Sequence, residues 1–145
     1  MKKQDNVLWL LFRALWLPGV IFLVNLLLDS LSQIYVRYPW LDIPMHLIGG
    51  AAIGYTGFVF LRYLKKVPYI HTFTWLMDFA MIIMWAAFIA VWWEGYELFL
   101  DTFLGRYTQP SVRDTVSDLY LGMIGAGISA VALISRGKTK ITKCV

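Results

Sequence analysis

The sequence predicts an all-α polytopic membrane protein: a bundle of four transmembrane helices with both termini in the cytoplasm. Its composition is 59% hydrophobic and only 15% charged, whereas a soluble domain is about 25% charged. The apolar residues fall in four blocks, each near the ~20 residues that a helix needs to cross a bilayer. The basic residues gather in alternate connections, as in membrane proteins. We expect a single transmembrane domain over residues 1–145.

The four spans are placed by the lengths of the apolar blocks. They cover about Leu17–Tyr35, Ile43–Tyr63, Asp78–Leu100 and Asp114–Ser135. An amphipathic segment, Asn6–Trp16, precedes the first span and forms either a separate interfacial helix or the beginning of a longer span. In the second case, the span starts near Val7 and continues past Pro18. No small-residue cleavage site follows, so we expect this segment in the mature protein.

The basic residues predict the orientation of the spans. Ten of them flank the termini and the second connection: Lys2, Lys3, Arg13, Arg62, Lys65, Lys66, Arg136, Lys138, Lys140 and Lys143. Three occupy the other two connections: Arg37, Arg106 and Arg113. Cytoplasmic loops carry the excess of Lys and Arg, so we expect a multi-pass protein of the cytoplasmic membrane with both termini on the cytoplasmic side. The net charge of +4 is therefore no sign of nucleic-acid binding, and the single Cys144 excludes an intramolecular disulfide.

Acidic residues gather at the outer ends of three predicted spans. At ~1.5 Å of rise per residue, several of them lie roughly 5–10 Å below the outer interface. This shared depth predicts one polar site that faces the extracytoplasmic side. Its members are Asp42, His46, Glu94, Glu97, Asp114 and Asp118. Asp29, on a face of the first span shared with Asn25, is a further candidate.

The charged faces of the helices also carry small residues. Asp42 and His46 are four residues apart and share a face, which Gly49, Ile53 and Gly57 continue. Asp114, Asp118, Gly122, Gly125 and Ser129 form a similar stripe on the fourth span. Membrane helices approach each other most closely on small-residue faces. We therefore expect the acidic side chains to point into the bundle.

Crowded carboxylates in a medium of low dielectric constant need a bound metal, basic partners or shared protons. Carboxylates with one imidazole suit a divalent metal, and Mg²⁺, Mn²⁺, Zn²⁺ and Fe²⁺ all remain open. Glu94 or His46 is the expected catalytic base. The simpler interpretation is that acids at helix starts serve only as caps or dipole partners. We prefer it for Asp78, and it is equally good for Asp42 or Asp114 taken alone.

The connection between the third and fourth spans holds a second set of candidates. Arg106, Gln109 and Arg113 there form either a clamp for a substrate phosphate or carboxylate or pairs with Asp101 and Asp114.

Three ordered elements resemble the YjdF-like (DUF2238) family of small bacterial inner-membrane proteins. They are Asp42-Ile-Pro-Met-His46, Trp93-Glu94-Gly-Tyr-Glu97, and the segment from Thr108-Gln109 to Asp114-Thr-Val-Ser-Asp118. More loosely, their order resembles the VanZ-like group. The resemblance implies a shared site at the six residues above and names no substrate. Pro110-Ser111 and Arg113 depart from the family pattern, and the chain is expected to lack one or more N-terminal spans.

Three classes of function fit these observations. The first is a metal-dependent hydrolase or transferase that acts on a lipid or polyprenyl head group in the outer leaflet. The second is a cation or proton transporter or channel subunit that uses the same carboxylates. The third is a non-catalytic protein that binds a lipid-linked precursor. We expect a membrane lipid or lipid-linked substrate as the partner, and the sequence leaves a homo-oligomer open.

Overall fold

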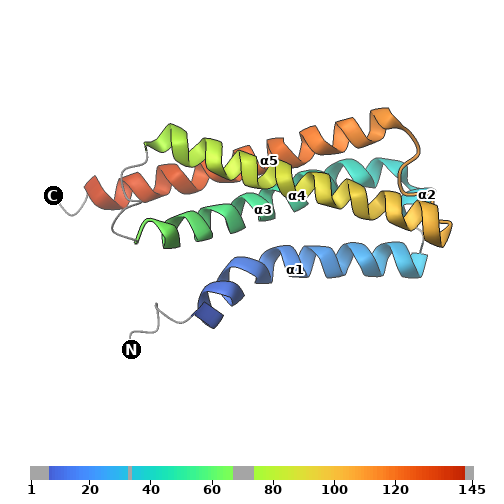
Figure 1. Cartoon of the computed structure of the whole chain (residues 1–145), viewed down its shortest axis with the longest axis horizontal. Helices are drawn as coiled ribbons and strands as arrows, with labels where there is room; N and C mark the ends of the chain where they lie inside the picture. Colours follow the sequence, from blue (N-terminus) through green and yellow to red (C-terminus); the bar gives the residue numbers. More distant parts are fainter. Residues whose placement is uncertain (1–6, 33, 67–73, 143–145) are drawn as a thin grey trace.

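The computed structural model describes residues 7–32, 34–66 and 74–142, and the regular structure of these residues is entirely helical (Figure 1). The elements are α1 (Val7–Ser32), α2 (Ile34–Arg37), the 3-10 turn η1 (Pro39–Leu41), α3 (Asp42–Leu64), α4 (Trp75–Leu104) and α5 (Val112–Thr142). Four stretches are long and apolar enough to cross a membrane: Val7–Asp29, Pro39–Leu64, Trp75–Leu104 and Val112–Arg136. The predicted class of fold is confirmed. Lys2, Lys3, Asn6, Lys143 and Cys144 lie outside the described residues.

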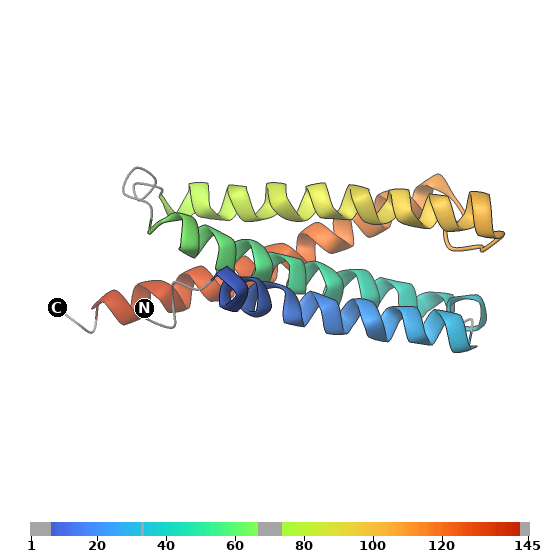
Figure 2. The same cartoon turned by 60° about the horizontal axis from the view of Figure 1, so that its bottom comes forward.

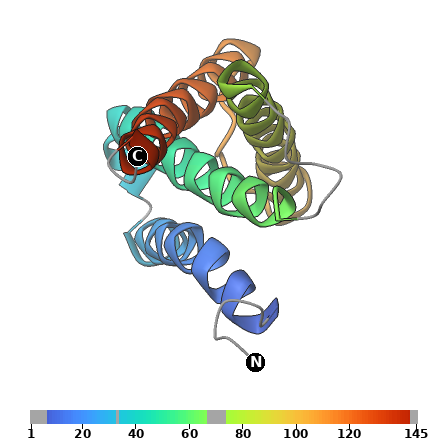
Figure 3. The same cartoon turned by 90° about the vertical axis from the view of Figure 1, so that its left-hand side faces the viewer.

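The helices α3, α4 and α5 pack together, and α1 lies beside them against α3 (Figure 3). Figure 2 shows α3 between α1 and α4. The first residues of α1 and α4 lie at the same end of the bundle as the last residues of α3 and α5. The opposite end, which we call the site end, holds the connections from α1 to α3 and from α4 to α5. The side of the membrane that each end faces stays a prediction from the charges.

Two helices extend beyond the predicted spans because their caps lie farther out. The hydroxyl of Thr74 accepts the Met77 N–H at 3.3 Å and begins α4. Gly105, with φ of 61°, ends that helix in the left-handed conformation, which costs glycine little. The hydroxyl of Ser111 accepts the Asp114 N–H at 3.2 Å at the beginning of α5. The sequence prediction began both helices at their first acidic residue, which is one turn inside the cap.

The predicted lead-in segment is the first part of α1, so the longer first span that starts near Val7 is the one observed. Pro18 lies inside this helix. Proline has no N–H, so the carbonyl of Ala14, four residues earlier, loses its helical partner. The Thr56 hydroxyl of α3 donates to this carbonyl at 2.8 Å, and both residues are almost fully buried. A side chain of a neighbouring helix thereby satisfies the freed carbonyl inside the membrane.

Thr56→Val is therefore expected to loosen α1 from α3. The substitution preserves the shape of the side chain but leaves the Ala14 carbonyl without its donor, and interhelical hydrogen bonds in membranes contribute about 0.6–2 kcal/mol. We expect a lower midpoint of unfolding in detergent, with α1 becoming accessible to protease first. Thr56→Ser retains the donor and is the control. Equal stability of the Val and Ser variants would show that this hydrogen bond does not stabilise the packing of α1 against α3.

The closest approach between helices is that of α3 and α5. A Cβ atom at Gly50 would overlap the backbone of Gly122, and one at Gly125 would overlap the carbonyl of Leu47. At Gly54 the added atom would lie 2.8 Å from the backbone of Ala126. The expected stripe was wrong at Gly49, where an added Cβ would meet nothing within 4 Å. The small-residue face is rotated by one position, and Gly49 borders open space instead.

The end of the bundle away from the site is packed with apolar side chains. Leu61, Ile82 and Ala130 form a buried cluster there, and Phe58, Phe79 and Ile134 pack against it. At the same end, Lys65 donates to the carboxylate of Asp78. Asp78 is thus neutralised by a partner in addition to lying at the start of α4.

Candidate functional site

Five predicted residues come together at the site end, and we call them the acidic cluster: Asp42, His46, Glu94, Glu97 and Asp118. His46 Nε2 lies 3.3 Å from Asp42 Oδ1 on the same helix and 3.9 Å from Asp118 Oδ2 on α5. His46 also forms a second group with Glu94 and Glu97 of α4. In each group, one ligand atom per residue lies within 4.8 Å of the others. The imidazole is therefore shared by two triads.

Three of the four carboxylates of the cluster are buried, and that of Asp42 is partly exposed. Asp118 is 3% exposed, Glu94 7% and Glu97 9%. Neutral side chains reach two of them: Trp93 Nε1 donates to Glu97 at 2.9 Å, and Gln109 Nε2 donates to Glu94 at 2.7 Å, with the Thr115 side chain a further hydrogen-bond partner of Glu94. Among the described residues, no lysine or arginine forms an ion pair with any of the four carboxylates. The cluster therefore concentrates four carboxylates around a single basic side chain, that of His46.

Three acids outside the cluster are compensated individually. Asp78 pairs with Lys65, and Asp29 lies 3.5 Å from the Arg106 guanidinium. Asp101 accepts three hydrogen bonds from the connection between α4 and α5: from the Thr108 N–H and hydroxyl, each at 2.7 Å, and from the Gln109 N–H at 2.9 Å. In the acidic cluster, by contrast, four carboxylates share one imidazole, that of His46.

Asp101 also positions Gln109. Its hydrogen bonds fold the connection back onto α4, where the Thr108 hydroxyl also donates to the Glu97 carbonyl at 3.2 Å. Gln109 then reaches both the carboxylate and the carbonyl of Glu94, the latter at 2.9 Å. The sequence analysis did not assign this role to Asp101. Its signal was a carboxylate just before a Gly105 cap, followed closely by Thr and Gln.

The remaining predicted site residues lie around the cluster. Asp114 is half-buried at the start of α5 and belongs to neither triad. Arg106 pairs with Asp29, not with the two acids that the sequence analysis considered for it. Arg113 is exposed. Gln109 donates hydrogen bonds to Glu94 and so holds this member of the cluster in place.

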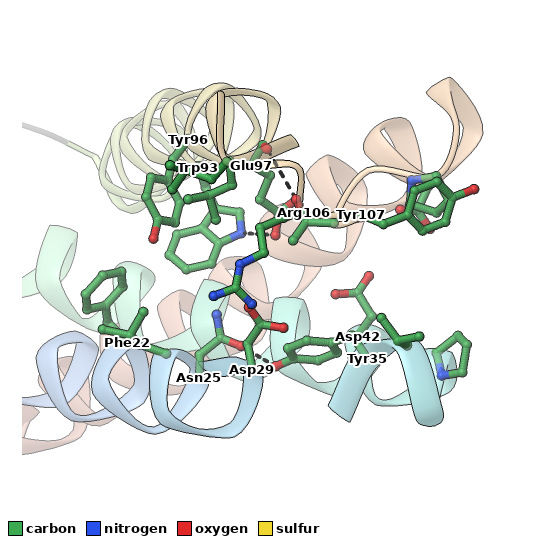
Figure 4. Close-up of a pocket in the computed structure, with 18 residues that line it drawn as sticks. Phe22, Asn25, Asp29, Tyr35, Asp42, Trp93, Tyr96, Glu97, Arg106 and Tyr107 are labelled. Atoms are coloured by element: carbon green, nitrogen blue, oxygen red, sulfur yellow. Dashed lines mark hydrogen bonds and ion pairs between the residues drawn. The ribbon is translucent and has the colours of Figure 1, made fainter. Parts of the chain in front are cut away.

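Two cavities border the cluster. The end cavity, of about 470 Å³, is lined by α1, α2, α4 and the connection that carries Arg106 (Figure 4). The mid-bundle cavity, of about 400 Å³, lies deeper between α1, α3 and α4. Asp42 and Glu97 line both cavities and His46 lines the deeper one, whereas Glu94 and Asp118 line neither. The triads thus have one side turned to open space and one side buried.

Tyr35 and Asn25 complete the wall of both cavities. The Tyr35 hydroxyl donates to the Asn25 side-chain carbonyl (Figure 4). Tyr35 lies between the first and second spans, and burial raises the pKa of its phenol, with the negative charge of Asp42 adding to the effect. Tyr35 therefore remains a neutral donor. The sequence analysis named Asn25 but missed Tyr35, because the four-residue α2 has no periodic pattern that marks it.

These features define a multi-pass membrane protein with a buried histidine–carboxylate cluster beside an intramembrane cavity. The chain belongs to the family described as "Predicted membrane protein (DUF2238)", which it matches over residues 9–139. The family expected from the three sequence elements is confirmed. No curated protein and no solved structure matches the chain significantly. The looser resemblance to the VanZ-like group stays a prediction.

Proposed function

We propose that the acidic cluster binds a divalent cation and that the protein acts on the head group of a membrane lipid or lipid-linked substrate. The observation that carries this proposal is the group of four carboxylates around His46 within the membrane spans, three of them buried, with no lysine or arginine of the described residues paired to any of them. Buried charges of one sign require a counter-ion or shared protons. Asp29, Asp78 and Asp101 each have a partner of their own.

The ligand atoms are suited to a hard or borderline cation. Carboxylate oxygens with one imidazole nitrogen bind Mg²⁺, Mn²⁺, Fe²⁺ or Zn²⁺. Such a cation, when bound, polarises a phosphoryl or carbonyl oxygen and lowers the pKa of water. Gln109 holds Glu94, Trp93 holds Glu97, and Asp42 orients His46. These contacts fix the ligands as outer partners do in metal sites.

Of the two residues expected as bases, His46 has the better access to the cavity. It lines the mid-bundle cavity, whereas Glu94 lines neither cavity and its carboxylate is held by Gln109. The carboxylate of Asp42, 3.3 Å from the ring, favours the tautomer and orientation of the imidazole. An imidazole nitrogen that binds the cation cannot also accept a proton, so we assign both His46 and Glu94 to holding the cation, His46 from the cavity side, and proton transfer to a water whose pKa the cation would lower.

The alternative of a transport pathway receives less support. A proton or cation path needs polar groups along the whole span. Below the cluster, the three-helix core of the described residues is apolar, with Leu61, Ile82 and Ala130 at its centre. The buried Thr56 hydroxyl there is already engaged by backbone carbonyls. This arrangement favours a site that is open from one end.

The reaction is tested in vesicles made of bacterial polar lipids. Purified protein is incubated with Mn²⁺ or Mg²⁺, or with a chelator, and the lipids and released head groups are followed by mass spectrometry. We expect loss of one lipid class and release of a water-soluble product with the cation only, and no change with Asp118→Asn. Cation-dependent retention of a lipid without conversion would identify a binding protein. If the lipids are neither converted nor retained, the proposal is contradicted.

A further inference from the structure

The two cavities have the shape and chemistry to hold one lipid molecule. We propose that the cleft between α1 and α4 seats a phosphate monoester on a long apolar chain, with the chain in the mid-bundle cavity and the phosphate in the end cavity beside Arg106. This inference rests on the proposed function and names the class of substrate.

The mid-bundle cavity suits an apolar chain. Its volume of about 400 Å³ is within the ~300–1,000 Å³ of small-molecule sites. Ile21 of α1 and Ile89 of α4 form parts of two walls, and Gly49 and Ile53 of α3 lie between them. All four residues lie in membrane-spanning stretches. The medium around this part of the bundle is therefore lipid, and a chain can occupy the cavity without crossing water.

An aromatic junction joins the two cavities. Phe22 of α1 meets Trp93 of α4 edge to face, with centroids 5.8 Å apart, and Tyr96 at 6.5 Å. These three residues line both cavities, as Asp42 and Glu97 do. In Figure 4 the three rings lie on one side of the end cavity, with Arg106 and the carboxylates beyond them. A ligand that spans the junction places its apolar part behind the rings and its polar part at the cluster.

Arg106 gives the end cavity its preference for an anion. It is the basic residue among those that line this cavity. Its contact with Asp29 is a single approach at 3.5 Å, and the Arg106 side chain is 38% exposed. A guanidinium has five N–H donors, which suit a phosphate group. Most of these donors remain available to a ligand that enters the cavity.

The charges predict that the lipid and the cation bind together. Asp42, Glu97 and Asp114 line the same cavity as Arg106, and they repel a phosphate unless a cation lies between them. Divalent cations commonly bridge carboxylates and substrate phosphates. The chain itself adds little affinity, because the surrounding lipid is equally apolar. The protein therefore selects its ligand by the phosphate group, and the mid-bundle cavity needs only to accommodate the chain.

Gly49 provides the test, because a side chain there enters open space in the mid-bundle cavity. Gly49→Phe is expected to fill the cavity from α3, and Ile21→Trp to narrow it from α1. The control is Gly95→Phe, the same exchange at an exposed position where an added Cβ also meets nothing within 4 Å. Gly95 lines neither cavity.

The experiment uses the full chain in phosphatidylcholine vesicles with Mn²⁺. The probes are phosphatidic acid and a polyprenyl phosphate, each with a photoreactive group in its chain. We expect labelling of α1 and α4, reduced about tenfold in Gly49→Phe and Ile21→Trp, equivalent to ~1.4 kcal/mol of binding free energy, and unchanged in Gly95→Phe. Labelling by either probe supports the proposal and identifies the source of the phosphate.

Two outcomes would overturn this inference. They are equal labelling of Gly49→Phe, Ile21→Trp and the control, and absence of labelling by both probes. Manganese content is measured on the same samples. If manganese is retained and the labelling pattern fails, the lipid seat is wrong but the metal site stands. If manganese is absent from the unsubstituted protein, the proposed function itself fails.

Discussion

Asp118→Asn is expected to remove the cation affinity of the protein and to leave its fold intact. Asparagine has nearly the same shape as aspartate, so a side chain that is 3% exposed is replaced without a void. The substitution removes one negative charge from a cluster that holds four carboxylates around His46. Mutation of the outer partners that hold metal ligands already lowers metal affinity about 10–100-fold. The loss of a direct ligand should therefore lower the cation affinity by more than that.

The sign of the stability change makes this prediction specific. Without a cation, Asp118→Asn should unfold at the same temperature as the unsubstituted protein or higher, because repulsion among the carboxylates falls. With a cation at 100 times its Kd, the unsubstituted protein should gain about 2.7 kcal/mol, and the variant should gain nothing. Thermal unfolding in detergent, with chelator or with added Mn²⁺, measures both values.

Asp114→Asn is the matched control, because it makes the same exchange one helical turn earlier on α5. Asp114 belongs to neither triad, so its variant should retain the cation-dependent gain in stability. Glu94→Gln should behave like Asp118→Asn. Equal cation-dependent gains in all three variants would show that the cluster is a network of shared protons and hydrogen bonds without a metal.

Gly50→Ala is expected to destabilise the bundle strongly, although alanine is the better helix former. A Cβ atom at Gly50 would overlap the backbone of Gly122 on α5, and a backbone cannot move aside as a side chain does. Overpacking costs about 1–3 kcal/mol and sometimes more, and separation of α3 from α5 would also move His46 away from Asp118. We expect a value at the upper end of that range, together with weaker cation binding.

The neighbouring position gives the opposite prediction. An added Cβ at Gly49 meets no atom within 4 Å, so Gly49→Ala should be neutral or stabilise the helix by up to about 1 kcal/mol. The unfolding midpoints of the two variants in the same detergent measure the difference. A destabilisation by Gly49→Ala that equals that by Gly50→Ala would contradict the observed register of α3 against α5.

Much of the fold follows from apolar block lengths and helical spacing. The second span was predicted at Ile43–Tyr63 and observed as Asp42–Leu64, because Pro39 and Lys65 bracket a long, mostly apolar segment. The first span was less predictable. Pro18 usually ends or bends a helix, and its tolerance depends on the hydroxyl of Thr56, which lies 38 positions later in the sequence and donates to Ala14. Local pattern does not reveal such a distant partner.

The candidate site was likewise predictable in part from the sequence. Coincident depth on three helices predicted that His46, Glu94, Glu97 and Asp118 meet, and the structure brings them together. The partners of the outer connection were not predictable, because Arg106, Thr108 and Gln109 belong to a segment without periodicity. Their positions depend on three hydrogen bonds to Asp101 and on the way α1 places Asp29.

The most direct test of the account is the metal content of the purified protein, measured by elemental mass spectrometry after equilibration with Mn²⁺, Zn²⁺ or Mg²⁺. His46 belongs to both triads, so His46→Ala is measured beside the unsubstituted protein. The account predicts about one equivalent of metal in the unsubstituted protein, in line with a single shared site, and its loss in His46→Ala. Absence of metal from both proteins, or equal metal in both, would contradict it.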